Sequence, residues 1–516
     1  MATSVLIVGS GPTGLVAALT LAQNGVDVRV IEKLPHFPIG QRGAGIMPRS
    51  LEIYRYLGVM DDIKKAGSYI HEWLEYENGK PVKQFAVTSY REPTPIYPNN
   101  PWLLGQDAAC RILRDHLKEF GVKVELSTEL LTIEQGADSV TATIAKEGAE
   151  EKVTAKYVIG ADGAKGIVRK LLNLTFVGET RDALHLITGD VVVTGVDEKH
   201  WHKFGDAPAD AVMLRPTDRT AAESVYFIML CGPDLDYQRV VEDHDYLRES
   251  VYRVTKVPEL KIGKIETIAD YRPNIRVANT FQQGRVFIAG DAAHVHSPTG
   301  GQGMNSSMMD AFNLSWKLAL AVKGLAAPGL LDSYSEERLP VIKEMLNLTT
   351  ALLNKTFDAK TRKAGDPSPR RGESRGEHVW RADADRLHAG DRAHDAPGLV
   401  DVKTGRTTRL FDVFGPTRHT VLVFADGADP VSVVKAVERL PAGTVRVVAV
   451  YPKSSSTGAV EGVGLTLRDE DGHAYPAYGA ASEAAKIAIV RPDGVVGALV
   501  GGIEGVEKYF KGVFAI

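Results

Sequence analysis

The chain has 516 residues, a formal net charge of −4, 14 histidines and two cysteines. This charge gives no support for a nucleic-acid partner or an anionic membrane surface, and the histidines lack the spacing of a metal site. Cys110 and Cys231 lie far apart and imply no disulfide scaffold, so the cytoplasm is the expected location. No apolar run reaches the roughly 20 residues of a membrane helix, and the first strand begins too early to leave room for a signal peptide.

The first forty residues carry the pattern of a dinucleotide-binding turn. Residues 5–8 predict a buried strand, residues 15–24 predict a helix, and residues 26–31 predict a second strand that ends at Glu32. Between the first strand and the helix lie Gly9, Ser10, Gly11, Pro12, Thr13 and Gly14. This order is typical of a pyrophosphate bound at a helix N-terminus, with the acid accepting hydrogen bonds from ribose hydroxyls. A glycine turn without a ligand is the alternative, and the presence of both strands, the helix and the acid disfavours it.

Polar groups follow at three later points. Arg42 lies in a glycine-containing run, and Gln106 stands at the start of a predicted helix. Residues 157–160 predict a strand that leads into Asp162 and Gly163, with Arg169 a few residues further on.

The run FIAGDAAHVHSPTGGQGMN, residues 287–305, is the most informative stretch of the chain. An apolar strand ending places Asp291 at its tip, and a predicted helix begins near Met304 and Asn305. The loop between them contains Pro298, Gly300, Gly301 and Gly303. Glycines let the backbone approach a ligand closely, and the new helix directs free N–H groups and its positive dipole end toward that loop. These features together suit a large, partly anionic cofactor.

The three motifs, in this order and at comparable spacing, resemble the FAD-dependent aromatic hydroxylases of the para-hydroxybenzoate hydroxylase and phenol 2-monooxygenase type. The resemblance implies FAD as the cofactor. It also implies that the FAD-binding residues are Gly9, Gly11, Pro12, Thr13, Gly14, Glu32, Lys33, Arg42, Gln106, Asp162, Asp291, Gly301, Gly303, Met304 and Asn305. One departure is visible, because Gly166 stands where the middle motif of the family usually has a serine.

The predicted fold is α/β, with a Rossmann-like FAD-binding domain interleaved with a β-rich substrate domain. Residues 1–70, 103–180 and 270–355 are assigned to the first, and residues 71–102 and 181–269 to the second. Residues 356–395 are charged and poor in large apolar groups, which is typical of a linker. Residues 396–516 resemble the thioredoxin-like tail of the phenol and polyketide hydroxylases. They contain no cysteine, so thiol–disulfide chemistry is impossible there.

The resemblance implies hydroxylation of a phenolic or related small aromatic substrate with O₂ through a flavin hydroperoxide. The chain shows no second GxGxxG, which agrees with a transiently bound NADPH or NADH as reductant. The β-rich segments would roof the flavin, with Phe227, Met229 and Leu230 as expected walls of a dry pocket. A homodimer is expected from similar tails in the family.

The expected catalytic residues are Tyr271, His296 and Pro298. The carboxylate that the phenol hydroxylases use as base is replaced by Ala44. Tyr271 precedes Arg276 with the spacing of the relatives' phenol-binding tyrosine, and a tyrosine packed at a domain interface explains it equally well. His296 is explained either by contact with substrate or by a structural role.

Three alternatives stay open. An FAD-dependent reductase or oxidase of the same fold would not transfer oxygen, and a flavin-binding protein without catalysis would serve to recruit a partner. A flavin-dependent halogenase is disfavoured because no tryptophan stands in a Trp-x-Trp motif. The substrate and the choice of NADH or NADPH are not determined by the sequence.

Overall fold

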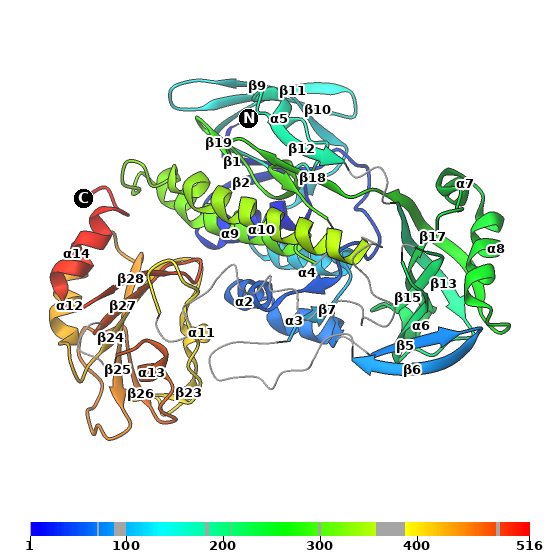
Figure 1. The fold of residues 1–516 in the computed structure, drawn as a ribbon. Helices are drawn as coiled ribbons and strands as arrows, with labels where there is room; N and C mark the ends of the chain where they lie inside the picture. Colours follow the sequence, from blue (N-terminus) through cyan, green and yellow to red (C-terminus); the bar gives the residue numbers. More distant parts are fainter. Residues whose placement is uncertain are drawn as a thin grey trace.

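The computed structural model describes residues 2–69, 72–86, 100–180, 185–207, 209–297, 301–357, 387–480 and 486–516. Figure 1 shows a central body of helices and a largely parallel sheet, a second sheet on its right and a smaller α/β tail on its left. Among the described residues, no helix is both long and apolar enough to cross a membrane.

The sheet of the central body follows the order β19-β20-β11-β1-β2-β8. Its strands are β1 (Ala2–Val8), β2 (Val28–Ile31), β8 (Val124–Glu125), β11 (Ala149–Gly160), β19 (Gln282–Gln283) and β20 (Val286–Ile288). Strand β1 pairs in parallel with β2 and β11, and β11 pairs in parallel with β20. Strands β9 (Thr128–Gln135) and β10 (Val140–Lys146) extend it as antiparallel neighbours of β11.

The register of this sheet brings the three sequence motifs to one edge. Val8 is paired with Gly160, and Gly160 is paired with Ile288. Each of these residues ends its strand, so the glycine turn, the middle motif and the late motif all start from one row. Ligands of open α/β sheets bind at the carboxyl ends of the strands.

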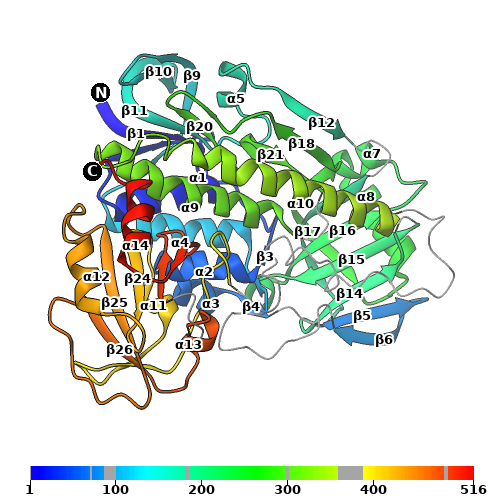
Figure 2. The same ribbon diagram turned by 60° about the vertical axis from the view of Figure 1, so that its left-hand side comes forward.

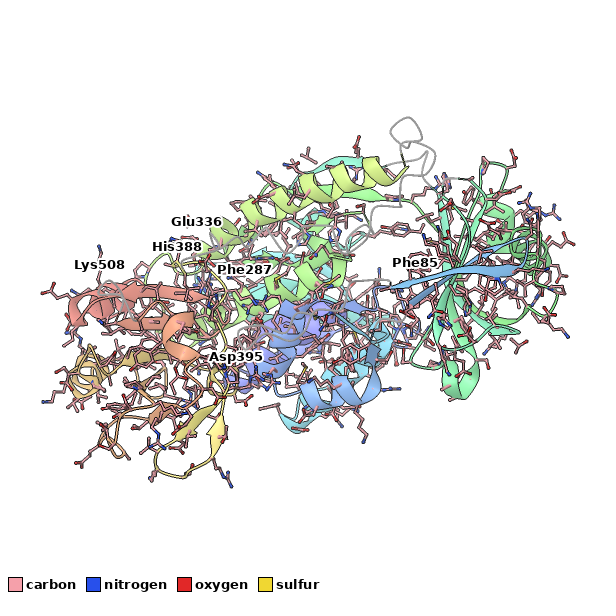
Figure 3. The ribbon with its side chains drawn as sticks, turned by 60° about the horizontal axis from the view of Figure 1, so that its bottom comes forward. Phe85, Phe287, Glu336, His388, Asp395 and Lys508 are labelled. Carbon is pink, nitrogen blue, oxygen red and sulfur yellow. The ribbon has the colours of Figure 1, made fainter. Side chains whose placement is uncertain are left out.

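Helices cover the sheet of the body. They are α1 (Pro12–Gln23), α2 (Pro48–Tyr56), α3 (Met60–Ala66), α4 (Gln106–Glu119), α5 (Val168–Leu171), α9 (Gly303–Val322) and α10 (Ser333–Phe357). Ten residues of α1 are buried, because the helix packs on α9 and α4 as well as on the sheet. Phe287, labelled in Figure 3, lies in the centre of this core between the rings of Tyr157 and Tyr334.

The second sheet follows the order β17-β13-β16-β15-β14-β5-β6 and is called the substrate sheet below. Its strands are β5 (Glu72–Glu77), β6 (Lys80–Ala86), β13 (Leu186–Thr194), β14 (His200–Gly205), β15 (Ala211–Pro216), β16 (Val225–Cys231) and β17 (Lys261–Tyr271). One face packs on α7 (Tyr237–Glu242) and α8 (His244–Thr255), which lie on the side away from the body in Figure 1. The short helix α6 (Thr220–Glu223) precedes β16.

Two small sheets join the body to the substrate sheet. One contains β12 (Phe176–Thr180), β18 (Asn274–Ala278) and β21 (His294–Val295), and the other contains β3 (Gly45–Ile46), β4 (Ser68–Tyr69) and β7 (Trp102–Leu103).

The tail has a mixed sheet of order β23-β22-β26-β25-β24-β27-β28. Its elements are β22 (Leu399–Asp401), β23 (Thr407–Thr408), α11 (Leu410–Val413), β24 (His419–Phe424), α12 (Pro430–Val437), β25 (Val445–Pro452), β26 (Leu465–Asp469), α13 (Ala474–Ala477), β27 (Ile487–Val490), β28 (Val496–Val500) and α14 (Ile503–Lys511). The apolar core of the tail includes Trp316 and Leu320 of α9, so tail and body share one core. Figure 2 shows α14 beside the body helices.

Most of the expected linker, residues 356–395, lies outside the described residues. The described part after 386 is well packed, with Ala393 and Asp395 completely buried. Asp395, labelled in Figure 3, accepts a hydrogen bond from the backbone N–H of Phe411 and pairs with Arg409.

Candidate active site

The three glycines of the first turn are required for two different structural purposes. Gly9 has φ of +104°, and a Cβ there would lie 2.3 Å from the carbonyl oxygen of Ala161. A Cβ at Gly14 would lie 2.1 Å from the carbonyl oxygen of Gly9. Gly11, just before α1, faces open space. The first and third glycines therefore close the turn against the sheet, and the second leaves room for a ligand at the helix N-terminus.

Glu32 lies beside this turn and is partly accessible. Its Oε2 accepts hydrogen bonds from the backbone N–H and the hydroxyl of Ser10, both at 3.0 Å, and its Oε1 accepts one from the N–H of Leu34 at 3.1 Å. The carboxylate is thus fixed next to the start of α1. The neighbouring Lys33 is exposed.

Asp162 of the middle motif is the most enclosed acid of this edge. Its Oδ2 accepts a hydrogen bond from the N–H of Val168 at 3.0 Å, whereas its buried Oδ1 has no partner. Burial raises the pKa of this carboxyl. A Cβ at Gly166 would lie 2.2 Å from the carboxyl carbon of Asp162, so the departure from the family serine makes room for this side chain.

Arg169 connects the middle motif to the late motif. Its guanidinium donates to the carbonyl oxygens of Ala164 and Ala292, both at 2.7 Å, and lies 3.7 Å from the ring centre of Phe176. The two motifs are therefore held together by a buried cation, and the side chain itself is not available to a ligand.

Asp291 stands in a short 3₁₀ turn, η1 (Gly290–Ala292), directly after β20. Its side chain is accessible, yet the surrounding protein raises the pKa of its carboxyl, an effect that His294 and Arg42 oppose. Arg42, with φ of +41°, therefore lies close enough for its charge to act on Asp291.

A buried cluster of charged side chains stabilises the η1 turn from the protein interior. Asp310 of α9 accepts hydrogen bonds from the N–H of Gly290 at 3.1 Å and from Arg338 at 2.7 Å, and it bonds to the His294 ring at 2.6 Å. Burial opposes ionisation of Asp310, but His294 and Arg338 outweigh it and lower the pKa of this carboxyl. His294 thus supports the loop and does not face the ligand side.

The start of α9 is fixed to the segment around Gly45 by Asn305. Its amide donates to the carbonyl oxygens of Gly45 at 2.9 Å and Gly301 at 2.7 Å, and it accepts from the N–H of Met47 at 2.9 Å. These bonds occupy the side chain, so Asn305 positions the helix start instead of bonding a ligand directly.

Two expected cofactor residues, Met304 and Gln106, meet at Gly43. A Cβ at Gly43 would lie 3.7 Å from Cβ of Met304 and 3.8 Å from the side-chain oxygen of Gln106. Gly303 stands close to the His296 ring, and Gly301 adopts φ of +65°.

Tyr271 ends β17 opposite Leu186, within a small apolar cluster that includes Cys231 and Met229. Burial and the charge of Asp291 raise the pKa of its hydroxyl to about 12. The tyrosine therefore lies at the junction between substrate sheet and late motif, and it stays protonated at neutral pH. Arg276 does not share this position, because it bonds to Asn274 and to strand β12.

His296 is buried, and its Nδ1 lies 2.9 Å from the carbonyl oxygen of Ser297. Its Nε2 is buried without a partner, and burial lowers the pKa of the ring to about 4. The third expected catalytic residue, Pro298, lies outside the described residues, as does Gly300.

The substrate sheet presents an aromatic face to the body. Strand alternation places Ile228 and Leu230 on the face packed against α7 and α8, and Phe227 and Met229 on the opposite face. The expectation that Leu230 lines the pocket was therefore wrong, since its neighbours on the strand face the body instead. Residues that the sequence reasoning missed on this face are Trp73, Trp201, Met213 and Arg215, and Leu103 of β7 packs against them. Residues 211–214 are continuously apolar, so the local sequence gave no signal for which of them share this face.

Known proteins share both the motifs and the fold. The sequence profile of the FAD binding domain family matches residues 2–349. The chain is 34% identical over 437 residues to a flavin-dependent monooxygenase of Mycobacteroides abscessus, covering 82% of this chain and 88% of that protein. It is 31% identical over 369 residues to the pentachlorophenol 4-monooxygenase of Sphingobium chlorophenolicum, covering 68% of this chain and 64% of that protein.

A solved complex of aklavinone-11 hydroxylase with FAD and aklavinone superimposes with a TM-score of 0.79, at 25% identity, covering 99% of this chain and 98% of that one. The fold is that of a flavoprotein monooxygenase. The chain belongs to the FAD-dependent aromatic monooxygenases, as the motifs predicted.

The residues present fit FAD. Gly11 leaves open space at the N-terminus of α1, where a pyrophosphate would accept backbone N–H groups. The accessible Asp291 carboxylate offers an acceptor to hydroxyl donors of the cofactor.

Proposed function

We propose that this protein hydroxylates a phenolic or related aromatic substrate with O₂, using NADPH or NADH to reduce its FAD. The observation that carries the proposal is the position of Tyr271. Its hydroxyl lies at the end of an apolar, aromatic sheet face and within electrostatic range of Asp291 in the late motif. An aromatic substrate on that face would meet the cofactor edge and a hydroxyl donor together.

Bound FAD would supply the electrons and the activated oxygen. The residues proposed to hold it are those of the three motifs, with Glu32 and the start of α1 on the ADP side and Asp291, Gly303 and Met304 nearer the ring. The N–H groups at the start of α9 would stabilise negative charge on the bound ring.

The chain's own residues would then bind the substrate and exclude water. Trp73, Trp201 and Phe227 supply flat apolar surface, and a dry pocket protects a reactive oxygen donor from water. Because its pKa is about 12, Tyr271 would donate a hydrogen bond to the substrate oxygen and stabilise a phenolate, instead of removing the proton. His296, neutral at physiological pH with an unpartnered Nε2, and Pro298 complete the proposed catalytic group.

The finer architecture belongs to the same proposal. The parallel sheet of the body is proposed as a Rossmann-like domain of residues 1–70, 103–180 and 270–355, and the substrate domain as 71–102 and 181–269. The tail from 396 is proposed as a thioredoxin-like domain without redox function, and residues 356–395 as the linker that joins it to the body. The tail is also proposed to stabilise a homodimer.

The test is a screen of phenols with the purified yellow protein, following NAD(P)H oxidation and incorporation of ¹⁸O from ¹⁸O₂ into product. Oxygen incorporation that depends on an aromatic substrate supports the proposal. Reduction or oxidation of substrate without ¹⁸O incorporation would instead establish the alternative, a reductase or oxidase of the same fold.

A further inference from the structure

The segment before Arg42 is held by three carboxylates from separate parts of the chain. The N–H of Gly40 donates to Asp107 at 3.1 Å, the N–H of Gln41 donates to Asp190 at 2.8 Å, and the Gln41 amide donates to Asp218 at 2.6 Å. Gln41 is only 2% exposed. Such a short stretch of loop is rarely fixed at three points unless its conformation matters.

Asp190 reaches this segment from the substrate sheet. It lies on β13 opposite Phe227 of β16, and Phe227 lies opposite Arg215 of β15. Directly paired residues point to the same face, so Asp190 shares the aromatic face that the proposed substrate would occupy. The Arg215 guanidinium lies 4.9 Å from the Phe227 ring centre and 3.5 Å from the side-chain oxygen of Gln41.

The contact between Asp190 and the segment is close-fitting. A Cβ at Gly40, where φ is +120°, would lie 2.9 Å from Oδ2 of Asp190. Asp190 is 2% exposed, its backbone N–H donates to the Thr267 hydroxyl at 3.1 Å, and its Oδ1 is buried without a partner. Among the described residues, the N–H of Gln41 is therefore the hydrogen-bond donor that the Asp190 carboxylate accepts from.

The residues that follow Gln41 lie against the start of α9. Arg42 adopts a left-handed φ of +41°, which costs a non-glycine residue on the order of 1 kcal/mol and persists only where neighbours fix it. Gly43 then lies against Met304 and Gln106. The Asp190–Gln41 hydrogen bond connects the backbone directly before this strained residue to the substrate sheet.

We propose that Asp190 is a positioning residue that, through the N–H of Gln41, fixes Arg42 and Gly43 against the start of α9 and so sets how efficiently oxygen transfer is coupled to NAD(P)H oxidation. The inference rests on the proposed function for its coupling readout. It adds a direct connection between the substrate-binding face and the segment beside the flavin.

The test compares Asp190→Ala with Asp190→Asn in the FAD-loaded full chain. Alanine removes the acceptor, whereas asparagine keeps a carbonyl oxygen for the Gln41 N–H. For Asp190→Ala, we expect the amount of hydroxylated product per NAD(P)H consumed to fall about two- to tenfold, which corresponds to the loss of one buried hydrogen bond. The amount of H₂O₂ should rise in proportion. The visible spectrum of the bound flavin should also shift. Asp190→Asn should restore most of the ratio and the wild-type spectrum.

Asp469→Ala is the matched control. Asp469 is a 1% exposed carboxylate that also accepts backbone N–H groups, but it ends β26 in the tail and bonds to the residues at the start of α13. It should lose stability without a change in coupling or flavin spectrum.

A wild-type ratio and spectrum in Asp190→Ala, or an asparagine variant as impaired as the alanine variant, would overturn the inference. If the wild-type protein forms no hydroxylated product, the proposed function fails instead, and the flavin spectrum of the two Asp190 variants still decides the positioning role.

Discussion

At the scale of single residues, the acids of the cofactor edge differ in how many of their carboxylate oxygens are already hydrogen-bonded and in how accessible they are. Glu32 is bonded by Ser10 and Leu34, and Asp162 is enclosed with one oxygen unpartnered. Asp291 is accessible. The same residue type thus closes a turn, fills an interior or faces the ligand space, according to its neighbours.

Tyr271→Phe should separate substrate chemistry from flavin binding. The ring stays in its apolar cluster, so FAD content and NAD(P)H oxidation should persist while hydroxylated product falls about ten- to a hundredfold, the effect of losing one hydrogen bond to a charged group. Product, peroxide and flavin content are measured together. Wild-type product yield would assign Tyr271 a packing role.

Gly166→Ser should weaken FAD binding, although it restores the residue usual in the family. The added Cβ would displace the Asp162 carboxyl from its place beside Val168. We expect reduced flavin content and a melting temperature lowered by about 1 °C per kcal/mol lost, as the unfolding entropy of 516 residues implies. Gly415→Ser, where a Cβ meets open space, is the control. Full flavin content in Gly166→Ser would show that the Asp162 carboxyl can move away from the added Cβ without loss of FAD binding.

At the scale of elements, α9 links the two ends of the molecule. Its first residues lie at the cofactor edge, while Trp316 and Leu320 near its other end belong to the tail core. Twenty residues of one helix therefore connect the proposed flavin ring to the tail, and a disturbance at either end has a rigid path to the other.

Asn305→Ala tests the cofactor end of this helix. The substitution leaves the N–H of Met47 and two carbonyl groups without their partner, which should cost about 1–3 kcal/mol in the free energy of unfolding. FAD should also dissociate faster because α9 loses its attachment to residues 45–47. Denaturant unfolding and flavin release are the measurements, and unchanged values for both would contradict the positioning role of Asn305.

At the scale of the whole molecule, a buried charge network attaches the tail to the body. Arg491 forms a paired contact with Glu337 of α10 at 2.9 and 2.8 Å, and Lys317 of α9 lies 3.1 Å from the same carboxylate. Asp493 accepts from the Trp316 indole at 3.2 Å and from Asn313 at 3.1 Å. The tail is therefore part of the folded unit and not a loosely attached appendage.

Arg491→Met should destabilise the whole molecule. Loss of the guanidinium leaves the buried Asp493 incompletely compensated, whereas Glu337, whose side chain is 36% exposed, keeps Lys317, so we expect a cost of about 1–3 kcal/mol. Arg439→Met removes an exposed pair with Glu507 and should cost less than about 1 kcal/mol. Chemical denaturation compares the two variants. Equal stabilities would mean that the buried network contributes no more than a surface pair.

Stability should also fall as the pH is lowered from about 6.5 to about 5. Burial lowers the pKa of His419 to about 3 and that of His296 to about 4, so in this range the unfolded chain binds protons that the folded chain does not. His419 lies among Trp316, Tyr509, Phe510 and Phe514, and His419→Phe should keep this packing. The slope of unfolding free energy against pH should become shallower by up to about 1.4 kcal/mol per pH unit. An unchanged slope would refute the assignment to His419.

The sequence by itself determined the cofactor class and the order of the motifs. Glycine turns, strand endings and the helix start near Met304 are local patterns, and the three meet because parallel strands bring their carboxyl ends to one edge, as Val8, Gly160 and Ile288 show. Local physics also predicted the α/β class and the β-rich roof.

Only the tertiary structure decided which polar side chains are already hydrogen-bonded within the protein and which face of the substrate sheet meets the body. Asn305 is bonded to backbone groups, Leu230 packs on the face covered by α7 and α8, and Asp190 accepts a hydrogen bond from Gln41. Each of these outcomes depends on contacts between residues more than 100 positions apart or on the choice of which sheet face meets the body. A local sequence pattern carries the periodicity of a strand, but not the identity of the surface that packs against it.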